Sequence, residues 1–139
     1  MISELVFLSL SVTLIFCQGL GIASISYALG TDTTERDPIR IISDMRSLLS
    51  QIQSEYENQN YTGASILADD VYLENYELIE VPLKKQNDTL MQETELMLRE
   101  ELRDLVKTRD NITGVLQLID RINSNLDDAD TLLTNQSGK

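Results

Sequence analysis

The chain of 139 residues has no histidine, no tryptophan and a single cysteine, and its 23 acidic residues outnumber its 11 lysines and arginines. Without histidine it lacks the commonest general base and the commonest transition-metal ligand. One cysteine excludes an intrachain disulfide and a thiolate zinc cluster. A formal net charge of -12 excludes the basic surface that a phosphate backbone requires, so we expect no nucleic-acid partner. The remaining carboxylates, amides, hydroxyls and phenols suit binding better than catalysis, and we expect neither catalytic residues nor enzymatic activity.

Residues 1–30 differ from the rest of the chain, because no charged residue occurs between Leu5 and Leu29. A transmembrane helix needs about 20 mainly apolar residues, so this segment is long enough for a retained anchor. A cleaved signal peptide is the alternative, since Ser26 and Ala28 supply the small residues of a cleavage site. Both interpretations place the acidic body on the extracytoplasmic side of a membrane, either anchored there or secreted.

Small side chains recur at every fourth position of this apolar segment. They are Ser9, Thr13, Cys17 and Gly21. Such a stripe lets membrane helices approach closely, so the anchor is expected to pack against helices of a membrane complex.

Four asparagines match the N-glycosylation acceptor pattern, namely Asn60, Asn87, Asn111 and Asn135. The first three fall in expected loops between helices, where a glycan would be accessible. The pattern supports export. The alternative is that asparagine, serine and threonine occur here because they favour loops and helix caps.

Apolar residues at steps of three and four predict four amphipathic helices after residue 37. Asp37 followed by Pro38 is a helix start, because the aspartate accepts from free amides and proline loses no hydrogen bond there. Pro82 is expected to end or kink the second helix. The expected helices cover about 38–57, 62–82, 88–107 and 115–133, with turns near 58–61, 84–87 and 110–114.

These helices predict an all-α protein, in which an N-terminal transmembrane or signal helix precedes an antiparallel four-helix bundle. The expected organisation is an anchor or signal at 1–30, a tether at 31–37, the bundle at 38–134 and a disordered tail at 135–139. Two stacked helical hairpins of the tetratricopeptide kind are the alternative, although the turn-like sequence 60–64 is not repeated near Asn111.

Carboxylates are concentrated on the second expected helix. Steps of three and four place four of them on one strip, namely Asp70, Glu74, Glu77 and Glu80. Glu93, Glu100 or Asp104 of the third helix could face this strip. Carboxylate oxygens bind hard cations, so the strip is a candidate metal site for iron or a similar ion. The alternative is a solvated face of an acidic protein, beside which Tyr72 and Tyr76 are core residues.

The residues that carry a family resemblance are Asn60-Tyr-Thr-Gly-Ala64, Tyr72-Leu-Glu-Asn-Tyr-Glu-Leu-Ile-Glu-Val-Pro-Leu83 and Leu98-Arg-Glu-Glu-Leu-Arg103. This pattern resembles the extracytoplasmic helical domain found beside, or fused to, prokaryotic high-affinity iron permeases. The resemblance implies a role in presenting iron to a permease or in regulating it. The permease's own iron motif is not matched, because Arg103 stands where its second acid would be.

In size, charge and single apolar segment the chain also resembles small exported accessory subunits of the copper membrane monooxygenase of ammonia-oxidising archaea. That resemblance implies a structural role beside a membrane enzyme. Two functions are therefore expected. The first is a non-catalytic, membrane-anchored accessory subunit of a larger membrane complex, and the alternative is a metal-binding protein that serves iron uptake through the carboxylate strip.

Overall fold

The computed structural model describes residues 36–137 of the chain. The chain divides into two units, Met1–Thr33 and Thr34–Lys139, and the described residues all belong to the second. The predicted anchor and its stripe of Ser9, Thr13, Cys17 and Gly21 lie outside the described residues. Within residues 36–137, no helix has the length and apolarity that crossing a bilayer requires.

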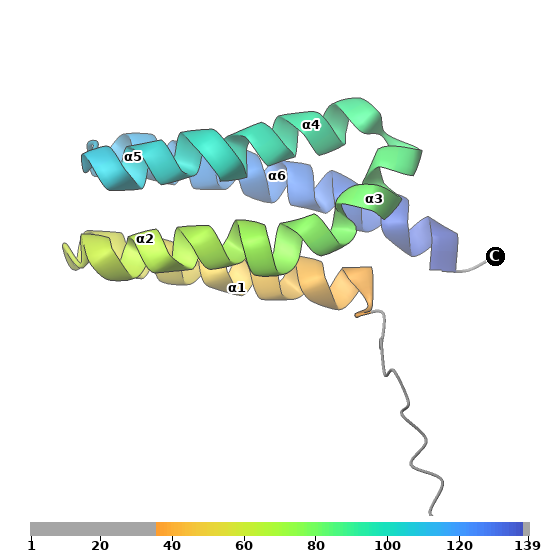
Figure 1. Cartoon of the computed structure of the whole chain (residues 1–139), viewed down its shortest axis with the longest axis horizontal. Coiled ribbons are helices and arrows are strands. Elements are labelled where there is room, and N and C mark those ends of the chain that lie inside the picture. The colour runs from red at the N-terminus through yellow and green to blue at the C-terminus, as the bar shows by residue number, and fades with distance from the viewer. Residues whose placement is uncertain (1–35, 138–139) are drawn as a thin grey trace, which may run out of the picture. The chain divides into compact units, whose positions relative to one another are not determined.

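Helical segments of the described chain form four rods, which run in alternating directions (Figure 1). The first rod is α1, Pro38–Glu57, and the last is α6, Ile112–Ser137. The second rod joins α2 (Tyr61–Asp70), the π-helical segment η1 (Val71–Tyr76) and α3 (Glu77–Gln86). The third joins α4 (Asp88–Leu96), the π-helical segment η2 (Met97–Leu102) and α5 (Arg103–Thr108).

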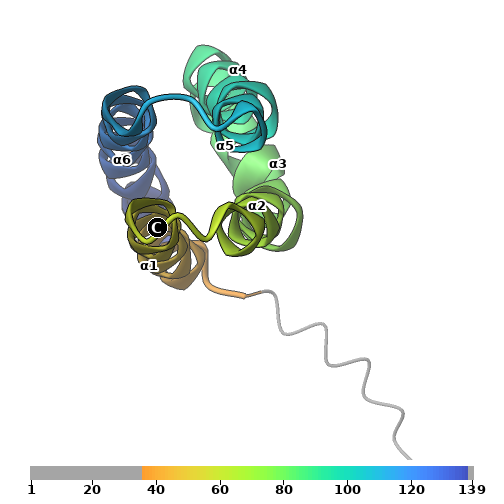
Figure 2. The same ribbon diagram turned by 90° about the vertical axis from the view of Figure 1, so that its left-hand side faces the viewer.

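The rods close into an antiparallel four-helix bundle. Figure 2, viewed along the rods, shows α1, α2, α5 and α6 at four corners. Helix α1 packs against both α2 and α6, so the first and last rods are neighbours. This closed arrangement confirms the predicted bundle and differs from two stacked hairpins. The start of α1 and the end of α6 lie at the same end of it (Figure 1).

Side chains cap the helix starts where the sequence predicts them. Asp37 accepts a hydrogen bond from the amide of Ile39 at 3.1 Å, with Pro38 in the first turn. Asn60 and Asn87 precede α2 and α4, and their Oδ1 atoms accept from backbone amides at 3.2 Å and 3.0 Å. Asn111 does the same ahead of α6, at 3.0 Å. Each cap satisfies an amide that the helix leaves free.

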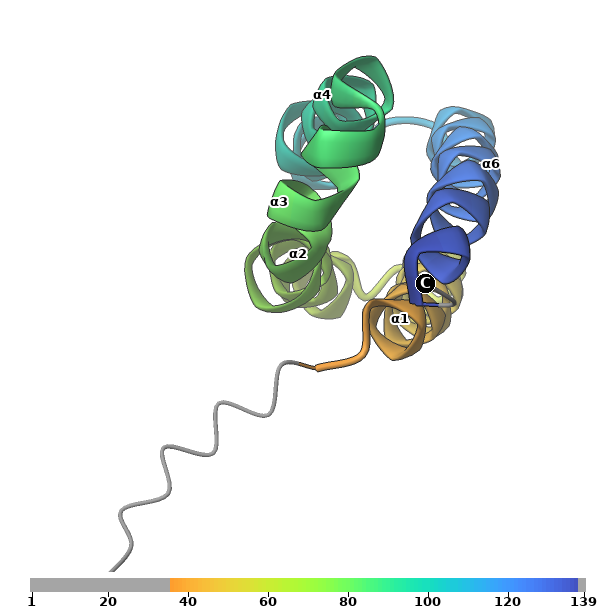
Figure 3. The same ribbon diagram turned by 90° about the vertical axis from the view of Figure 1, so that its right-hand side faces the viewer.

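Two helix ends differ from the prediction. The second rod continues through Pro82 to Gln86, so the predicted turn at 84–87 shrinks to Asn87. Proline inside a helix costs about 3 kcal/mol. Complete burial of Leu83, the next residue, is worth about 1.5–3 kcal/mol and offsets much of this cost. Figure 3 shows α3 leaving the line of α2 and rising towards α4. Helix α6 also continues past the predicted end at residue 134, so 135–137 are helical and not a disordered tail.

At the other end of the bundle lie the loop between α1 and α2 and the loop between α5 and α6. Each contains a residue with positive φ, Gln59 at 61° and Arg109 at 55°. The hydroxyl of Tyr56, in the last turn of α1, donates to the carbonyl of Asp110 in the loop before α6. The guanidinium carbon of Arg109 lies 5.0 Å from the centre of the Tyr61 ring. These contacts fix the two helical hairpins to each other.

The π-helical segments lie against the core. In η1, Val71 and Tyr72 are both buried, and so are Asn75 and Tyr76. A π turn contains one residue more than an α turn, so it shifts the face that the following residues present to the core. The Nδ2 of Asn75 donates to the carbonyl of Asp70 at 3.0 Å and satisfies an acceptor in the widened turn.

Candidate functional site

The predicted carboxylate strip does not gather around one point. Glu74 and Glu77 are exposed, whereas Glu80 is half-buried and faces Glu95 on α4. Burial raises the pKa of Glu80, and the negative charges of Glu95 and Glu77 raise it further. The half-buried Asp70 follows Asp69, whose carboxylate pairs with Arg103 on α5 at 2.6 Å.

Arg99 supplies positive charge where Glu80 and Glu95 meet. Its guanidinium donates to Glu95 Oε1 at 2.6 Å and to Glu100 Oε1 at 2.8 Å. Burial raises the pKa of the Tyr72 phenol, and the nearby Arg99 opposes part of this rise. The carboxylates between α3 and α4 are therefore neutralised in part by a side chain of the protein.

Tyr72 and Tyr76 belong to the core, in agreement with the structural interpretation of the sequence. Their rings stack with centres 6.3 Å apart. Tyr76 is completely buried, and its hydroxyl donates to the carbonyl of Met91 at 2.5 Å. Burial raises the pKa of Tyr76. A buried phenol with a satisfied hydroxyl holds the second rod against the third.

Metal binding gains no geometric support from the described residues. Within 36–137, no group of three or more aspartates, glutamates or other metal-ligating side chains is placed to hold an ion. The third-rod carboxylate whose charge acts on Glu80 is that of Glu95, and not that of Glu93, Glu100 or Asp104. In the sequence, the one sign that Glu95 takes part in an ion pair is the arginine four residues after it, Arg99. Iron binding by the strip stays a prediction.

Three of the four candidate glycosylation sites are also helix caps. The Nδ2 of Asn60 donates to Glu55 Oε2 at 2.5 Å, and the Nδ2 of Asn111 donates to Asp110 Oδ1 at 3.0 Å. Asn87 caps α4, and Asn135 is exposed on α6. Capping gives three asparagines a structural role at these positions. Their glycosylation stays a prediction.

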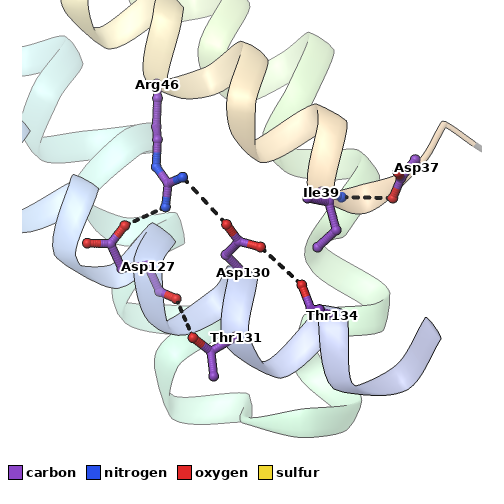
Figure 4. A network of polar contacts seen from close by, with 7 residues as sticks. All are labelled: Asp37, Ile39, Arg46, Asp127, Asp130, Thr131 and Thr134. Carbon is purple, nitrogen blue, oxygen red and sulfur yellow. Dashed lines mark hydrogen bonds and ion pairs between the residues drawn. The ribbon is translucent and has the colours of Figure 1, made fainter. Parts of the chain in front are cut away.

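An ion-pair network joins the first and last rods (Figure 4). Arg46 on α1 contacts Asp127 at 2.5 Å and Asp130 at 3.5 Å, both on α6. Asp130 Oδ1 in turn accepts from the hydroxyl of Thr134 at 3.2 Å. The side chain of Asp127 is 74% exposed, so this network contributes at most about 1 kcal/mol. Its role is to set how α6 lies on α1.

The second rod carries a row of apolar side chains on its solvent-facing side, which we call the outer apolar line. Its members and their exposed fractions are Ile66 (57%), Leu73 (46%), Leu78 (46%) and Val81 (62%). The remaining exposed large apolar residues of the described chain, Leu96 and Ile112, lie on other rods. Sequence periodicity missed this line, because the π-helical segment interrupts the spacing of three and four on which such a search depends.

Comparisons of this chain with protein-family models, with curated proteins and with solved structures found no match, so they place it in no family.

Proposed function

We propose that this protein is a non-catalytic helical subunit of a larger membrane complex, held at the membrane by residues 5–29. Its bundle stands on the extracytoplasmic side and docks on a partner subunit. The outer apolar line is the observation that carries this proposal.

Single exposed apolar residues are ordinary on soluble proteins, whereas a contiguous group marks a surface that another molecule covers. Four of the six large exposed apolar side chains of the described residues belong to this line. They lie opposite Ala64, Ala68 and Ile79, which face the core from the same rod. Covering the line would remove apolar area from water without disturbing the bundle.

The chemistry of the chain supports a role in assembly. The sequence contains no histidine for general base catalysis. The half-buried carboxylates between α3 and α4 share Arg99 as a counter-ion. The uncharged segment 5–29 has the length of a membrane anchor, which would concentrate the bundle beside membrane partners. The resemblance to accessory subunits makes the copper membrane monooxygenase of ammonia-oxidising archaea the first complex to test.

The proposal is tested on native membranes dissolved in a mild detergent. Native electrophoresis followed by mass spectrometry measures whether the chain migrates with other polypeptides, and the intact mass shows whether residues 1–30 are retained. We expect comigration and a mass that includes the N-terminal segment. A mature chain that starts at Leu29 and migrates alone would overturn the proposal. The same mass measurement reports any glycan on the four predicted asparagines.

A further inference from the structure

We infer that the outer apolar line binds an amphipathic helix of the partner subunit, whose lysines pair with Glu74 and Glu77. This inference rests on the proposed function and specifies its contact surface. It is drawn from the continuity of the line, from its charges and from the poor fit of other occupants.

The π-helical segment η1 makes the line continuous. Ile66 and Leu78 are twelve positions apart, which in an uninterrupted α-helix places them about 120° apart around the axis. The π turn takes up one extra residue and so reduces the rotation between them by about 100°. The directions of the two side chains around the helix axis then differ by about 20°. Leu73 and Val81 of the same rod are also exposed, at 46% and 62%. The line spans about 22 Å, which corresponds to about four turns of a partner helix.

The charges beside the middle of the line, Glu74 and Glu77, are negative and without partners among the described residues, whereas Lys84 and Lys85 follow Val81 at its C-terminal end. Glu74 follows Leu73 and Glu77 precedes Leu78, so each carboxylate borders an apolar side chain of the line. Both are exposed, and within residues 36–137 neither forms an ion pair or a hydrogen bond. An apolar strip with acidic borders is complementary to a helix that carries leucine-like residues every three or four positions and lysines beside them.

A second copy of this chain fits the surface poorly. In a two-fold pairing of the line with itself, Glu74 lies near the centre and meets its own copy. A net charge of -12 on each chain adds repulsion. The chain's own segment 5–29 is also a poor occupant, because it has no lysine or arginine to pair with Glu74 and Glu77.

A carbodiimide tests the ion pairs directly, since it joins a carboxylate to a lysine amine in contact with it. The reagent is applied to the native complex in detergent, and the joined peptides are identified by mass spectrometry. We expect Glu74 or Glu77 to be joined to a lysine of another polypeptide, within a segment whose apolar residues recur at steps of three and four. Asp44 on α1 and Asp120 on α6, both exposed on other rods, serve as controls and are expected to give no such product.

Two results would overturn the inference and leave the proposed function intact. In the first, the chain comigrates with a complex but only Asp44, Asp120 or other carboxylates away from the line are joined to the partner. In the second, Glu74 and Glu77 are joined only to lysines of this chain or of a second copy. A chain that migrates alone overturns both the inference and the proposed function.

Discussion

Asn125 on α6 donates a hydrogen bond from Nδ2 to the hydroxyl oxygen of Thr94 on α4, at 3.0 Å. Thr94 is completely buried, and its hydroxyl donates in turn to the carbonyl of Leu90 at 2.7 Å. The third and fourth rods are thus joined by a polar chain within an apolar core. Such a contact specifies how two rods align, because a displaced rod leaves a buried polar group without a partner.

Replacing Thr94 tests this contact. Thr94→Val keeps the shape of the side chain but leaves the amide of Asn125 unsatisfied, so we expect the free energy of unfolding to fall by about 1–3 kcal/mol. The double variant Thr94→Val with Asn125→Leu removes both polar groups and is expected to recover part of the loss. Urea unfolding of the full chain in mild detergent, followed by circular dichroism, measures the differences for these two variants and for Asn125→Leu alone. If the losses of unfolding free energy in the two single variants add up to the loss in the double variant, the two side chains do not interact.

Two glycines at equivalent helical positions form a matched pair. Gly63 and Gly114 each stand three residues after a capping asparagine. A Cβ on Gly63 would lie 2.5 Å from Asn60 Nδ2, whereas one on Gly114 has no neighbour nearer than 3.9 Å. We expect Gly114→Ala to stabilise the protein by about 0.5–1 kcal/mol through helix propensity.

Gly63→Ala should lose this gain, because the added methyl displaces the Asn60 side chain from its cap. The expected difference between the two variants is about 1 kcal/mol, the usual value of an N-cap. Urea unfolding of both variants under the same conditions measures it. Equal stabilisation by both substitutions would show that the Asn60 cap does not need the space that glycine leaves at position 63.

The carboxyl of Glu80 makes stability depend on pH. Its pKa in the folded state is raised by burial and by Glu95 and Glu77, so the folded protein binds this proton more tightly than the unfolded chain. Stability from this group therefore falls as pH rises from the ordinary range of glutamate through the raised pKa. We expect Glu80→Gln to have a higher Tm than the natural chain at pH 7, with the difference vanishing below about pH 4.

Thermal unfolding at several pH values measures this effect, with Asp120→Asn on the exposed side of α6 as the control. A natural chain that is more stable than Glu80→Gln at pH 7 would mean that attraction to Arg99 and Lys84 outweighs burial.

The outer apolar line is expected to matter for assembly and not for folding. Because Leu73 and Leu78 are about half exposed, changing both to glutamate should alter the free energy of unfolding by no more than about 1 kcal/mol. The same double change should abolish comigration with the membrane complex. Leu96→Glu is the matched control, since Leu96 is 45% exposed but lies on α4. Loss of comigration in the control alone would assign docking to another face.

Much of the fold could be predicted from the sequence, because burial follows the 3.6-residue period where a helix is regular. Helix α1 begins after Asp37 and ends at Glu57 as predicted. In α6, every apolar position predicted from Val115 to Leu133 is buried. These helices need only local periodicity and a cap for their prediction.

The parts that could not be predicted depend on packing between rods. No residue type is specific to a π turn, so the alignment of Ile66 with Leu78 does not follow from periodicity. The effect of the Glu95 charge on Glu80 depends on how α3 and α4 pack, which sequence periodicity does not give. Burial of Thr94 was missed for the same reason, since its partner Asn125 lies 31 positions away.

The extra residue in each π turn also determines where the chain can be shortened. Deleting one residue within Val71–Tyr76 would leave a regular α-helix in which α2 and α3 keep their present inward sides, because the π turn already contains one residue more than that helix needs. The same deletion within α1 would rotate everything beyond it by about 100° and expose core residues such as Ile52. Tolerance to loss of a single residue should therefore be concentrated in η1 and η2, in the middle of the second and third rods and not in the loops alone.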